Sequence, residues 1–431
     1  MLEPGEISYG DLTFQDSHPG IISAIASVAG LTPPAVENSR VLELGCGTGF
    51  NSLAMSVSIP GGHFTGIDFS PAHIRRAKEV AAAIGAKNVE FHCLSIDDFQ
   101  SAPGSFDYIV AHGVYSWVPA ATRDAILAIV RHSLSPHGLA YISYNTHPGW
   151  HLRSLVRDSL RYFPNPRQTL DQLTHAFINP DSAYARALRS EWDDARQQPD
   201  YYLAHEYLVP NCDPLYFHEF VSHAGRHQLQ FTGEARFFAN SFAQTEAVQG
   251  QLENAGANLI QREQHLDWLV GRYFRQTLLR HAGLPLARTP DPQSILEMNI
   301  ALNAEKPSAV SDEMYLGVIQ QLQRAAVVPA HEIELAGMPS PVVAAVLWSG
   351  WRDDLWTVRT DNPAITPIAC PLARYQAAAG PDCTNRLHRR VRLTPNEREL
   401  LLNFDANNPS SVGLAALALL ITPAPATESA R

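Results

Sequence analysis

Short apolar runs alternate with amphipathic stretches between residues 40 and 144. The amphipathic stretch at 70–84 places Ile74, Ala77 and Ala81 at helical spacing, and it begins with Ser70-Pro71, a typical helix start. The apolar runs are short and end at glycine or acidic residues, which is typical of buried strands. We predict strands at 40–44, 64–67, 89–94, 106–111 and 139–144. Strands and helices that alternate at this spacing indicate βαβ units on a parallel sheet, and hence an α/β fold.

The pattern changes after residue 151. Residues 152–200 are rich in Arg, Asp, Gln and Pro and predict helices with no strand between them. Later segments predict strands at 201–209 and 228–232, a helix at 214–226, helices over 241–285, and a strand at 295–302. The chain therefore divides into an N-terminal cap (1–40), a sheet domain (41–151 and 201–240), a helical insertion (152–200), a helical connecting region (241–293) and a C-terminal accessory α+β domain (294–431), for which a winged-helix-like arrangement is one option.

The composition is that of a globular protein and disfavours nucleic acids and membranes as partners. With 45% hydrophobic and 17% charged residues, the 431-residue chain can bury a large core. It carries 43 acidic and 32 basic residues, a net charge of −11, which disfavours a phosphate backbone as partner. The longest apolar run, at 412–422, is shorter than the roughly 20 residues that span a bilayer. We expect no nucleic-acid partner and no membrane insertion.

The cysteines and the N-terminal residues bear on location. The five cysteines are widely spaced and form no CxxC pair, which indicates free thiols in a reducing compartment. The first residues, MLEPGEISYGDL, show neither the basic start nor the apolar run of a signal peptide. We therefore expect a cytoplasmic protein.

A glycine-rich loop follows the first predicted strand and leads into a helix. The loop contains Gly45, Cys46, Gly47 and Gly49, and Glu43 precedes it on the strand. The glycines let the backbone approach a ligand closely, and the helix N-terminus favours acceptor or negative groups. Asp68 stands 19 residues after Gly49, at the end of the second strand. A carboxylate at this place can accept hydrogen bonds from both hydroxyls of a ribose.

Two classes of cofactor share this plan. Dinucleotide binders use GxGxxG, in which the third glycine lies one residue later than in this loop. The ExGxGxG pattern fits S-adenosylmethionine (SAM) better, because the amino-acid end of SAM then lies where a pyrophosphate would otherwise bind. A glycine turn with no ligand is the remaining alternative.

The segment after the third predicted strand offers an adenine contact. Asp97 can accept a hydrogen bond from an adenine amino group, while Ile96 and Phe69 can pack on the ring. The alternative is that Asp97 and Asp98 only cap the turn that follows.

The loop after the fourth predicted strand carries His112, Tyr115 and Trp117. Ligands of an open α/β sheet lie outside the carboxyl ends of its strands, so this loop is expected to meet the methyl acceptor. Aromatic faces also suit a cationic sulfonium or ammonium. Core packing remains the alternative for Trp117, and a hydrogen-bonded structural role remains the alternative for His112.

Several segments of the chain carry a family resemblance. The most discriminating are FDYIVAHGVYSWVP (106–119) and LAYISYNTHPGWHLRSLVRD (139–158), and RVLELGCGTGFN (40–51), HFTGIDFSPAHI (63–74), EYLVPNCDPLYFHEFVSHAGRHQLQFTGEA (206–235), DSHPGIISAIASVAGL (16–31) and EQHLDWLVGRYFRQTLLR (263–280) also fit. Together they resemble class I SAM-dependent methyltransferases, and within these the bacterial protein-lysine methyltransferases that carry a methyltransferase regulatory domain. The end of the chain is similar only in RLHRRVRLTPNERELLLNFD (386–405), and its Asp405-Ala406 differs from the Asp-Gly of relatives.

The resemblance implies a Rossmann-like, seven-stranded sheet, SAM as methyl donor with S-adenosyl-L-homocysteine as product, and a side-chain amine, lysine above all, as acceptor. It makes the sheet domain the SAM-binding core and 241–293 a regulatory region. It assigns Glu43, Gly45, Gly47 and Gly49 to the amino-acid end of SAM, Asp68 to the ribose, and Ile96 and Asp97 to the adenine. It places His112 beside both cofactor and acceptor, and Tyr115, Trp117, Tyr144 and Asn145 on the acceptor side as catalytic residues. From their places in the sequence, we also expect Cys46 and Phe69 to contact the cofactor and Tyr9 to close over it.

Three histidines raise the question of a metal. His218, His223 and His227 include a pair at i and i+4, a spacing that zinc sites use. No third ligand stands at a suitable spacing, and methyl transfer to nitrogen needs no metal. We therefore expect no metal.

The acceptor stays open among three alternatives. The first is a side-chain nitrogen of a protein or peptide. The second is a tailoring reaction on an amide, hydroxyl or amine of a ribosomal peptide or another secondary metabolite. The third is a regulatory protein that binds SAM without catalysis. The fold alone does not distinguish them. A protein or peptide partner follows from the first alternative, and a homodimer is left open.

Overall fold

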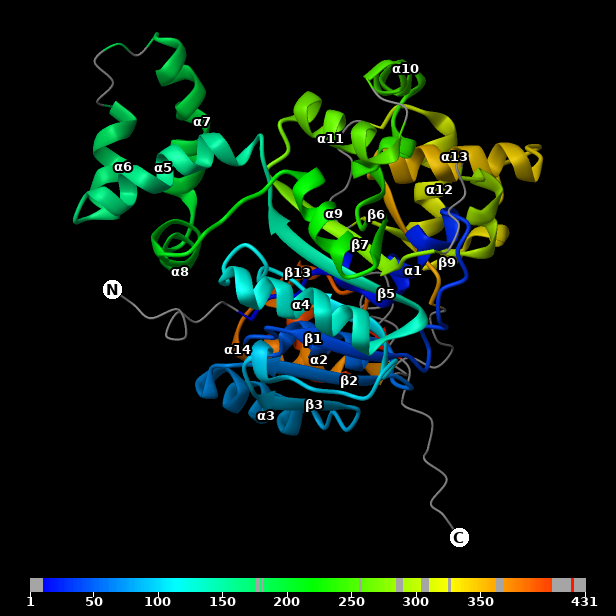
Figure 1. Ribbon diagram of the computed structural model, residues 1–431. Coiled ribbons are helices and arrows are strands. Elements are labelled where there is room, and N and C mark those ends of the chain that lie inside the picture. The colour runs from blue at the N-terminus through cyan, green and yellow to red at the C-terminus, as the bar shows by residue number, and fades with distance from the viewer. Residues whose placement is uncertain are drawn as a thin grey trace.

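A seven-stranded sheet forms the centre of the computed structural model, which describes residues 11–175, 179, 181–255, 258–283, 290–303, 310–324, 327–361, 368–404 and 420–421 (Figure 1). In sheet order the strands are β3 (Val89–Cys93), β2 (His63–Asp68), β1 (Arg40–Leu44), β4 (Phe106–Ala111), β5 (Leu134–Asn145), β7 (Phe274–His281) and β6 (Leu229–Glu234). The first five are parallel, and β7 lies antiparallel to both β5 and β6. The Rossmann-like, seven-stranded α/β sheet is thereby confirmed.

Helix α3 (Pro71–Ile84) begins and ends at the residues that its sequence indicated. The Ser70 side chain accepts a hydrogen bond from the His73 N–H, and Pro71 is the first helical residue. Gly85 ends the helix in the left-handed conformation, with a φ of 70°. The capping residues at its two ends therefore set where α3 begins and ends.

Helices cover both faces of the sheet. On one face, α1 (Pro19–Val28) and α2 (Phe50–Ser58) pack with strand residues such as Val41 and Tyr141. On the other face, α4 (Ala120–Ser133) and α9 (Phe217–Arg226) pack with Leu42 and Ile142. Because side chains alternate along a strand, each residue near the carboxyl edge belongs to one face or the other.

The helical insertion stands apart from the sheet as a separate lobe (Figure 1). It contains α5 (Trp150–Tyr162), α6 (Pro166–His175), α7 (Ala183–Gln197) and α8 (Asp200–Leu203), followed by a π-helix, η3 (Ala204–Leu208). Its own apolar cluster includes Val156, Leu188, Trp192 and Tyr207. The prediction of a strand at 201–209 is therefore wrong: the aromatic residues of this segment pack on the core of the lobe from a helix.

The connecting region is not wholly helical. Helices α10 (Glu246–Ala255) and α11 (Leu259–Val270) are followed by β7, which occupies the sheet between β5 and β6. The prediction of helices throughout 241–285 is therefore wrong for the last part, and the sheet does not close near residue 240. Arg275, on β7, is buried and bonded to the carboxylates of Glu234, Glu263 and Asp267. Because these carboxylates pair with the buried guanidinium, a strand that contains an arginine is stable inside the sheet.

Short strands and helices alternate in the C-terminal region. A three-stranded sheet has the order β10 (Trp356–Arg359), β8 (Asn299–Leu302) and β9 (Val328–Pro329). Two further pairs join β12 (Asp382–Thr384) to β13 (Arg390–Arg392) and β11 (Ile368–Ala369) to β14 (Leu420–Ile421). The helices are α12 (Glu313–Arg324), α13 (Ser340–Arg352), α14 (Pro371–Ala379) and α15 (Pro395–Leu402). The 3-10 segments of the chain are η1 (Gln15–Ser17), η2 (Ile96–Asp98), η4 (Phe237–Ala239), η5 (Ser241–Ala243), η6 (Pro292–Glu297) and η7 (Ala330–Glu332). Within the described ranges, none of the helices has the length and apolar character that a bilayer span requires.

Two hydrophobic clusters run across the predicted boundary between the connecting region (241–293) and the C-terminal domain (294–431). One joins α1 and the sheet to α13 and β10, and includes Phe237 stacked on Trp351 with ring centroids 3.8 Å apart. The other joins α2 and α3 to α14 and α15, and includes Phe50 and Leu401. The C-terminal region therefore shares its two larger cores with the sheet domain, and of its own it encloses the small cluster of Ala301, Val327 and Leu387.

Candidate active site

The glycine-rich loop turns from β1 into α2 at the carboxyl edge of the sheet. The Gly45 and Cys46 N–H groups donate to the Ile67 carbonyl of β2, and Gly45 has a φ of 71°. A Cβ at Gly45 would lie 2.5 Å from Val114 Cγ2, so a side chain is excluded there. At Gly47, with a φ of 53°, a Cβ would meet nothing within 4 Å. The backbone at Gly47 thus faces open space, as a loop that binds a ligand through its backbone requires.

Asp68 lies beside this loop at the end of β2. One carboxylate oxygen accepts the Gly47 N–H at 3.0 Å, and the other accepts the Ser70 N–H at 2.9 Å. The oxygen that accepts from Ser70 also lies 3.4 Å from His73 Nδ1, whereas the oxygen that accepts from Gly47 keeps a second lone pair for a ribose hydroxyl. The structure therefore brings together Gly47 and Asp68, which the spacing of the βαβ unit had placed at one edge.

Glu43 is buried under the loop. The Asn51 amide donates to one of its oxygens at 2.8 Å, and the Ser52 hydroxyl donates to the other. Burial raises the pKa of Glu43 to about 7, against the effect of these hydrogen bonds. Glu43 thus ties the first turn of α2 to β1 directly below the proposed place of the amino-acid end of SAM.

Asn51 connects three distant segments at this point. Its Oδ1 accepts the Phe14 N–H at 2.9 Å and lies 2.5 Å from His388 Nε2 of the C-terminal region. Its Nδ2 donates to Glu43. Neither Phe14 nor His388 was expected at the site from the sequence, because no local pattern links residues 14, 51 and 388.

The proposed adenine side is formed by η2 and the end of β2. Ile96 is buried, and Asp97 accepts a hydrogen bond from the Thr122 hydroxyl at 3.0 Å. The Phe69 residue is 60% exposed, so its ring is open to packing against a planar ligand. These placements suit the predicted adenine contacts, which stay a proposal.

His112 lies at the carboxyl end of β4 against the N-terminal segment. The ring of Phe14 stacks on it, with centroids 3.5 Å apart. The Tyr141 hydroxyl accepts from the Gln276 amide at 2.9 Å and lies 2.8 Å from His112 Nδ1, to which it can donate. Burial, and next the charge of Arg236, lower the pKa of His112 to about 3. His112 is therefore a neutral, firmly held imidazole at physiological pH.

Trp117 and Asn145 lie at the base of the helical insertion. The half-buried Trp117 ring meets His205 and Trp150 edge to face, with centroids 4.9 and 6.3 Å apart. The Asn145 N–H donates to the Ser116 hydroxyl at 2.8 Å. We name Trp117, Asn145, Trp150 and His205 the acceptor wall, in which Trp117 is the accessible member and the buried Asn145, Trp150 and His205 support it. The wrong strand prediction at 201–209 concealed the contribution of His205.

Tyr115 and Tyr144 do not line this wall. Both are 1% exposed and belong to the core between the sheet, α4 and α9, where their rings pack on Phe220. The Tyr115 hydroxyl bonds to His223 at 2.6 Å, and the Tyr144 hydroxyl bonds to Thr277 at 3.1 Å. We therefore remove both from the catalytic residues. Tyr9 lies outside the described residues.

Asp68→Ala is expected to weaken SAM binding at least tenfold. A hydrogen bond to a charged group contributes about 1.5–3 kcal/mol, and the substitution also releases the Gly47 N–H. Titration calorimetry with SAM measures the effect, and Asp107→Ala, which removes a partner of Arg40 at the far end of β4, is the matched control. Unchanged SAM affinity in Asp68→Ala, or tight NAD binding by the parent, would contradict the assignment.

Family models agree with this geometry. A model described as a methyltransferase domain matches residues 35–196, and one described as a predicted methyltransferase regulatory domain matches residues 199–281. An uncharacterised protein of Rickettsia prowazekii is 36% identical over 230 residues, which are 51% of this chain and 92% of that protein. Another from the same organism is 36% identical over 315 residues, or 70% of this chain, but the match spans only 57% of that relative's length.

A solved structure extends the likeness to nearly the whole chain. PKMT2 from Rickettsia typhi superimposes with a TM-score of 0.82 at 25% identity, over 95% of this chain and 91% of that one. Its complex with AdoHcy gives a TM-score of 0.81 at 26% identity, over 94% and 90% of the two chains. AdoHcy is what SAM becomes when it has given up its methyl group. The chain therefore belongs to the class I SAM-dependent methyltransferases that carry a methyltransferase regulatory domain, and SAM is its methyl donor.

Proposed function

We propose that this methyltransferase transfers the methyl group of SAM to a side-chain nitrogen of a protein or peptide, with lysine as the acceptor. The observation that carries the proposal is the likeness to PKMT2, a protein-lysine methyltransferase, over 95% of this chain. The shared part includes the helical insertion and the C-terminal region as well as the sheet. Because the sheet alone serves many acceptors, a likeness that extends to the surrounding parts bears more directly on the acceptor.

The acceptor wall has the character that an amine acceptor needs. A lysine amine has an ordinary pKa of about 10.4 and must lose its proton before it can attack the methyl group. The guanidinium of Arg157 lies 5.6 Å from the centre of the Trp117 ring. An aromatic, partly dry wall that already holds a positive charge disfavours an ammonium ion, and so lowers the pKa of an approaching lysine.

Methyl transfer is a direct displacement, so alignment of nitrogen, methyl carbon and sulfur is the main requirement. In the proposed site, His112 lies between the glycine-rich loop and Asn145, with Phe14 stacked on its ring. Its low pKa keeps it uncharged, which avoids repulsion of the cationic sulfonium. His112 and Phe14 thus act as positioning residues, and Asn145 is the side chain available to direct the acceptor nitrogen.

Trp117→Ala is expected to reduce kcat on a lysine peptide by about 10- to 100-fold, since a displacement of about 1 Å in the acceptor costs that much. SAM affinity should stay within twofold of the parent. Trp268→Ala, which removes an exposed tryptophan of α11, is the matched control and should leave both quantities unchanged. Equal losses of SAM affinity and kcat in Trp117→Ala would instead indicate a cofactor or folding role.

The identity of the acceptor is tested by transfer of labelled methyl groups from SAM to peptides and host lysate, with mass mapping of the product. A lysine acceptor predicts methylated side-chain nitrogen, and a rate that rises with pH until the bound amine is deprotonated. Methyl groups on oxygen, carbon or amide nitrogen of a small molecule or ribosomal peptide, with no lysine product, would overturn the proposal in favour of a tailoring reaction.

A further inference from the structure

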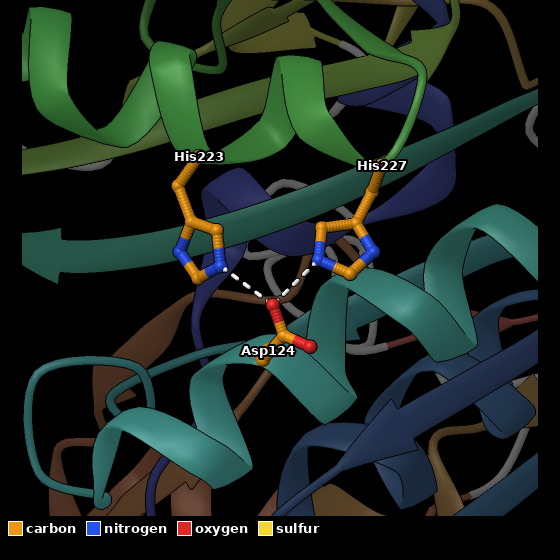
Figure 2. A group of neighbouring side chains, drawn as sticks. All are labelled: Asp124, His223 and His227. Atoms are coloured by element: carbon orange, nitrogen blue, oxygen red, sulfur yellow. Dashed lines mark hydrogen bonds and ion pairs between the residues drawn. The ribbon is translucent and has the colours of Figure 1, made fainter.

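Three side chains with metal-binding atoms converge where α4 meets α9 (Figure 2). Asp124 lies on α4, His223 lies in the last turn of α9, and His227 is the residue that ends this helix. The sequence shows the histidine pair, but the third residue precedes His223 by 99 positions and could not be recognised by spacing. The histidine pair has no third candidate ligand at a suitable spacing in the sequence, and the fold supplies one in Asp124.

The three side chains direct their ligand atoms at one point. His223 Nε2 and His227 Nε2 lie 3.1 and 2.8 Å from the same oxygen of Asp124, and the potential ligand atoms all lie within 4.8 Å of one another. Around a tetrahedral ion with bonds of about 2.0–2.1 Å, neighbouring ligand atoms are about 3.3 Å apart. The two Asp124–histidine distances lie within about 0.5 Å of this value, whereas the two imidazole nitrogens, up to 4.8 Å apart, would have to approach each other by as much as about 1.5 Å to hold an ion.

The second ring nitrogen of His223 already has a hydrogen-bond partner. The Tyr115 hydroxyl lies 2.6 Å from His223 Nδ1, and Tyr115 is buried in the core. A hydrogen bond to the second ring nitrogen is the usual support of a metal-binding histidine, because it fixes the tautomer and the orientation of the ring. This contact also gives the buried Tyr115 hydroxyl a role that the methyl-transfer site does not provide.

We propose that Asp124, His223 and His227 form a binding site for a divalent transition metal, with Zn²⁺ as the favoured ion. Two imidazole nitrogens and one carboxylate oxygen suit Zn²⁺, whereas Ca²⁺ and Mg²⁺ favour oxygen ligands throughout. The Asp124 side chain is 60% exposed, so water can reach a fourth position.

The role of this ion is structural. It joins α4 to the end of α9, at a place separate from the glycine-rich loop. Thr122, two residues before Asp124, donates to Asp97 on the proposed adenine side. A metal that holds α4 in place therefore also steadies the partner of Asp97, while methyl transfer itself proceeds without metal chemistry.

Zinc titration of the metal-free full-length protein, in competition with a chromophoric chelator, tests the site. We expect one equivalent of Zn²⁺ per chain. We expect His227→Ala and Asp124→Asn each to weaken binding by at least about 100-fold, because each removes a ligand of the ion and the loss of a mere supporting group already costs about 10–100-fold. His218→Ala is the matched control: it removes another histidine of α9, one bonded to Gln264 on α11, and should leave zinc affinity unchanged.

Two further readouts separate a built site from adventitious binding. Co²⁺ in place of Zn²⁺ should give the visible absorption of a four-coordinate centre in the parent and lose it in Asp124→Asn. Zinc should raise the melting temperature of the parent but not that of Asp124→Asn. Zinc affinity that is equal in the parent, His227→Ala and Asp124→Asn would overturn the proposal and leave a hydrogen-bonded cluster; loss of affinity in His218→Ala would likewise overturn it.

Discussion

Arg275→Met is expected to lower the free energy of unfolding by about 3–5 kcal/mol, the cost of removing one partner from a buried ion pair. The buried Arg275 guanidinium bonds to Glu234 at 2.6 Å, to Asp267 at 2.8 Å and to Glu263 at 3.3 Å. Methionine fills much of the same volume but leaves these carboxylates without the cation that they share. Chemical denaturation at several pH values measures the effect.

The pH dependence identifies the cause. Burial raises the pKa of Asp267 to about 6, above its ordinary 3.8, so its ionisation costs stability as pH rises through this range. Without Arg275 this pKa rises further, so the deficit of the variant should be larger at pH 8 than at pH 5. Arg40→Met removes an exposed pair with Asp107 and should cost less than about 1 kcal/mol. A deficit for Arg275→Met that is the same at both pH values would point to packing instead.

The protein is expected to unfold in a single thermal transition, and a chain that ends at residue 283 is expected not to fold. The hydrophobic cluster that α1 and the sheet share with α13 and β10 includes Phe237, whose ring packs on Trp348 and Trp351 of α13. Burial of each large apolar side chain stabilises by about 1.5–3 kcal/mol, so the loss of several such contacts equals a typical total stability of about 5–15 kcal/mol. Calorimetry and circular dichroism measure both outcomes.

Trp351→Ala is the point substitution that accompanies the truncation. It should destabilise the whole protein by about 3–5 kcal/mol. The temperature at which SAM binding is lost should fall by as many degrees as the melting temperature measured by calorimetry. Two separate transitions, or a folded truncated chain that binds SAM, would restore the separate C-terminal domain predicted for residues 294–431.

The parallel part of the sheet could be predicted because each of its strands is a local signal. Strands β1 and β4 and the later part of β5 are apolar runs, β2 and β3 interleave apolar with polar residues, and α3 carries its own caps. Strand β7 could not, because its sequence FRQTLLRH contains buried Arg275 and Thr277, whose partner Glu234 lies on another strand. A polar side chain is stable in a core only through partners that the local sequence does not contain.

The residues of the candidate site likewise divide into those that the sequence could predict and those that it could not. The glycine-rich loop and Asp68 follow from one βαβ unit, in which spacing alone brings strand ends together. Tyr144 and Asn145 are neighbours on β5 and therefore point to opposite faces of the sheet, so they could not both line one wall. Strand alternation would have revealed this error. No such rule could place Phe14 and His388 beside Asn51, because tertiary packing alone joins them.

The contact of Asn51 with the N-terminal segment and with the C-terminal region limits how such enzymes can be recombined. A single amide holds Glu43 on one side and meets Phe14 and His388 on the other. A chimaera that combined this SAM-binding sheet with the C-terminal region of a relative would have to transfer residues 14, 51 and 388 as a matched set. The parts that surround the sheet are therefore not interchangeable attachments. New acceptor specificity is more readily engineered by replacing the whole lobe from α5 to η3, which holds its own apolar cluster.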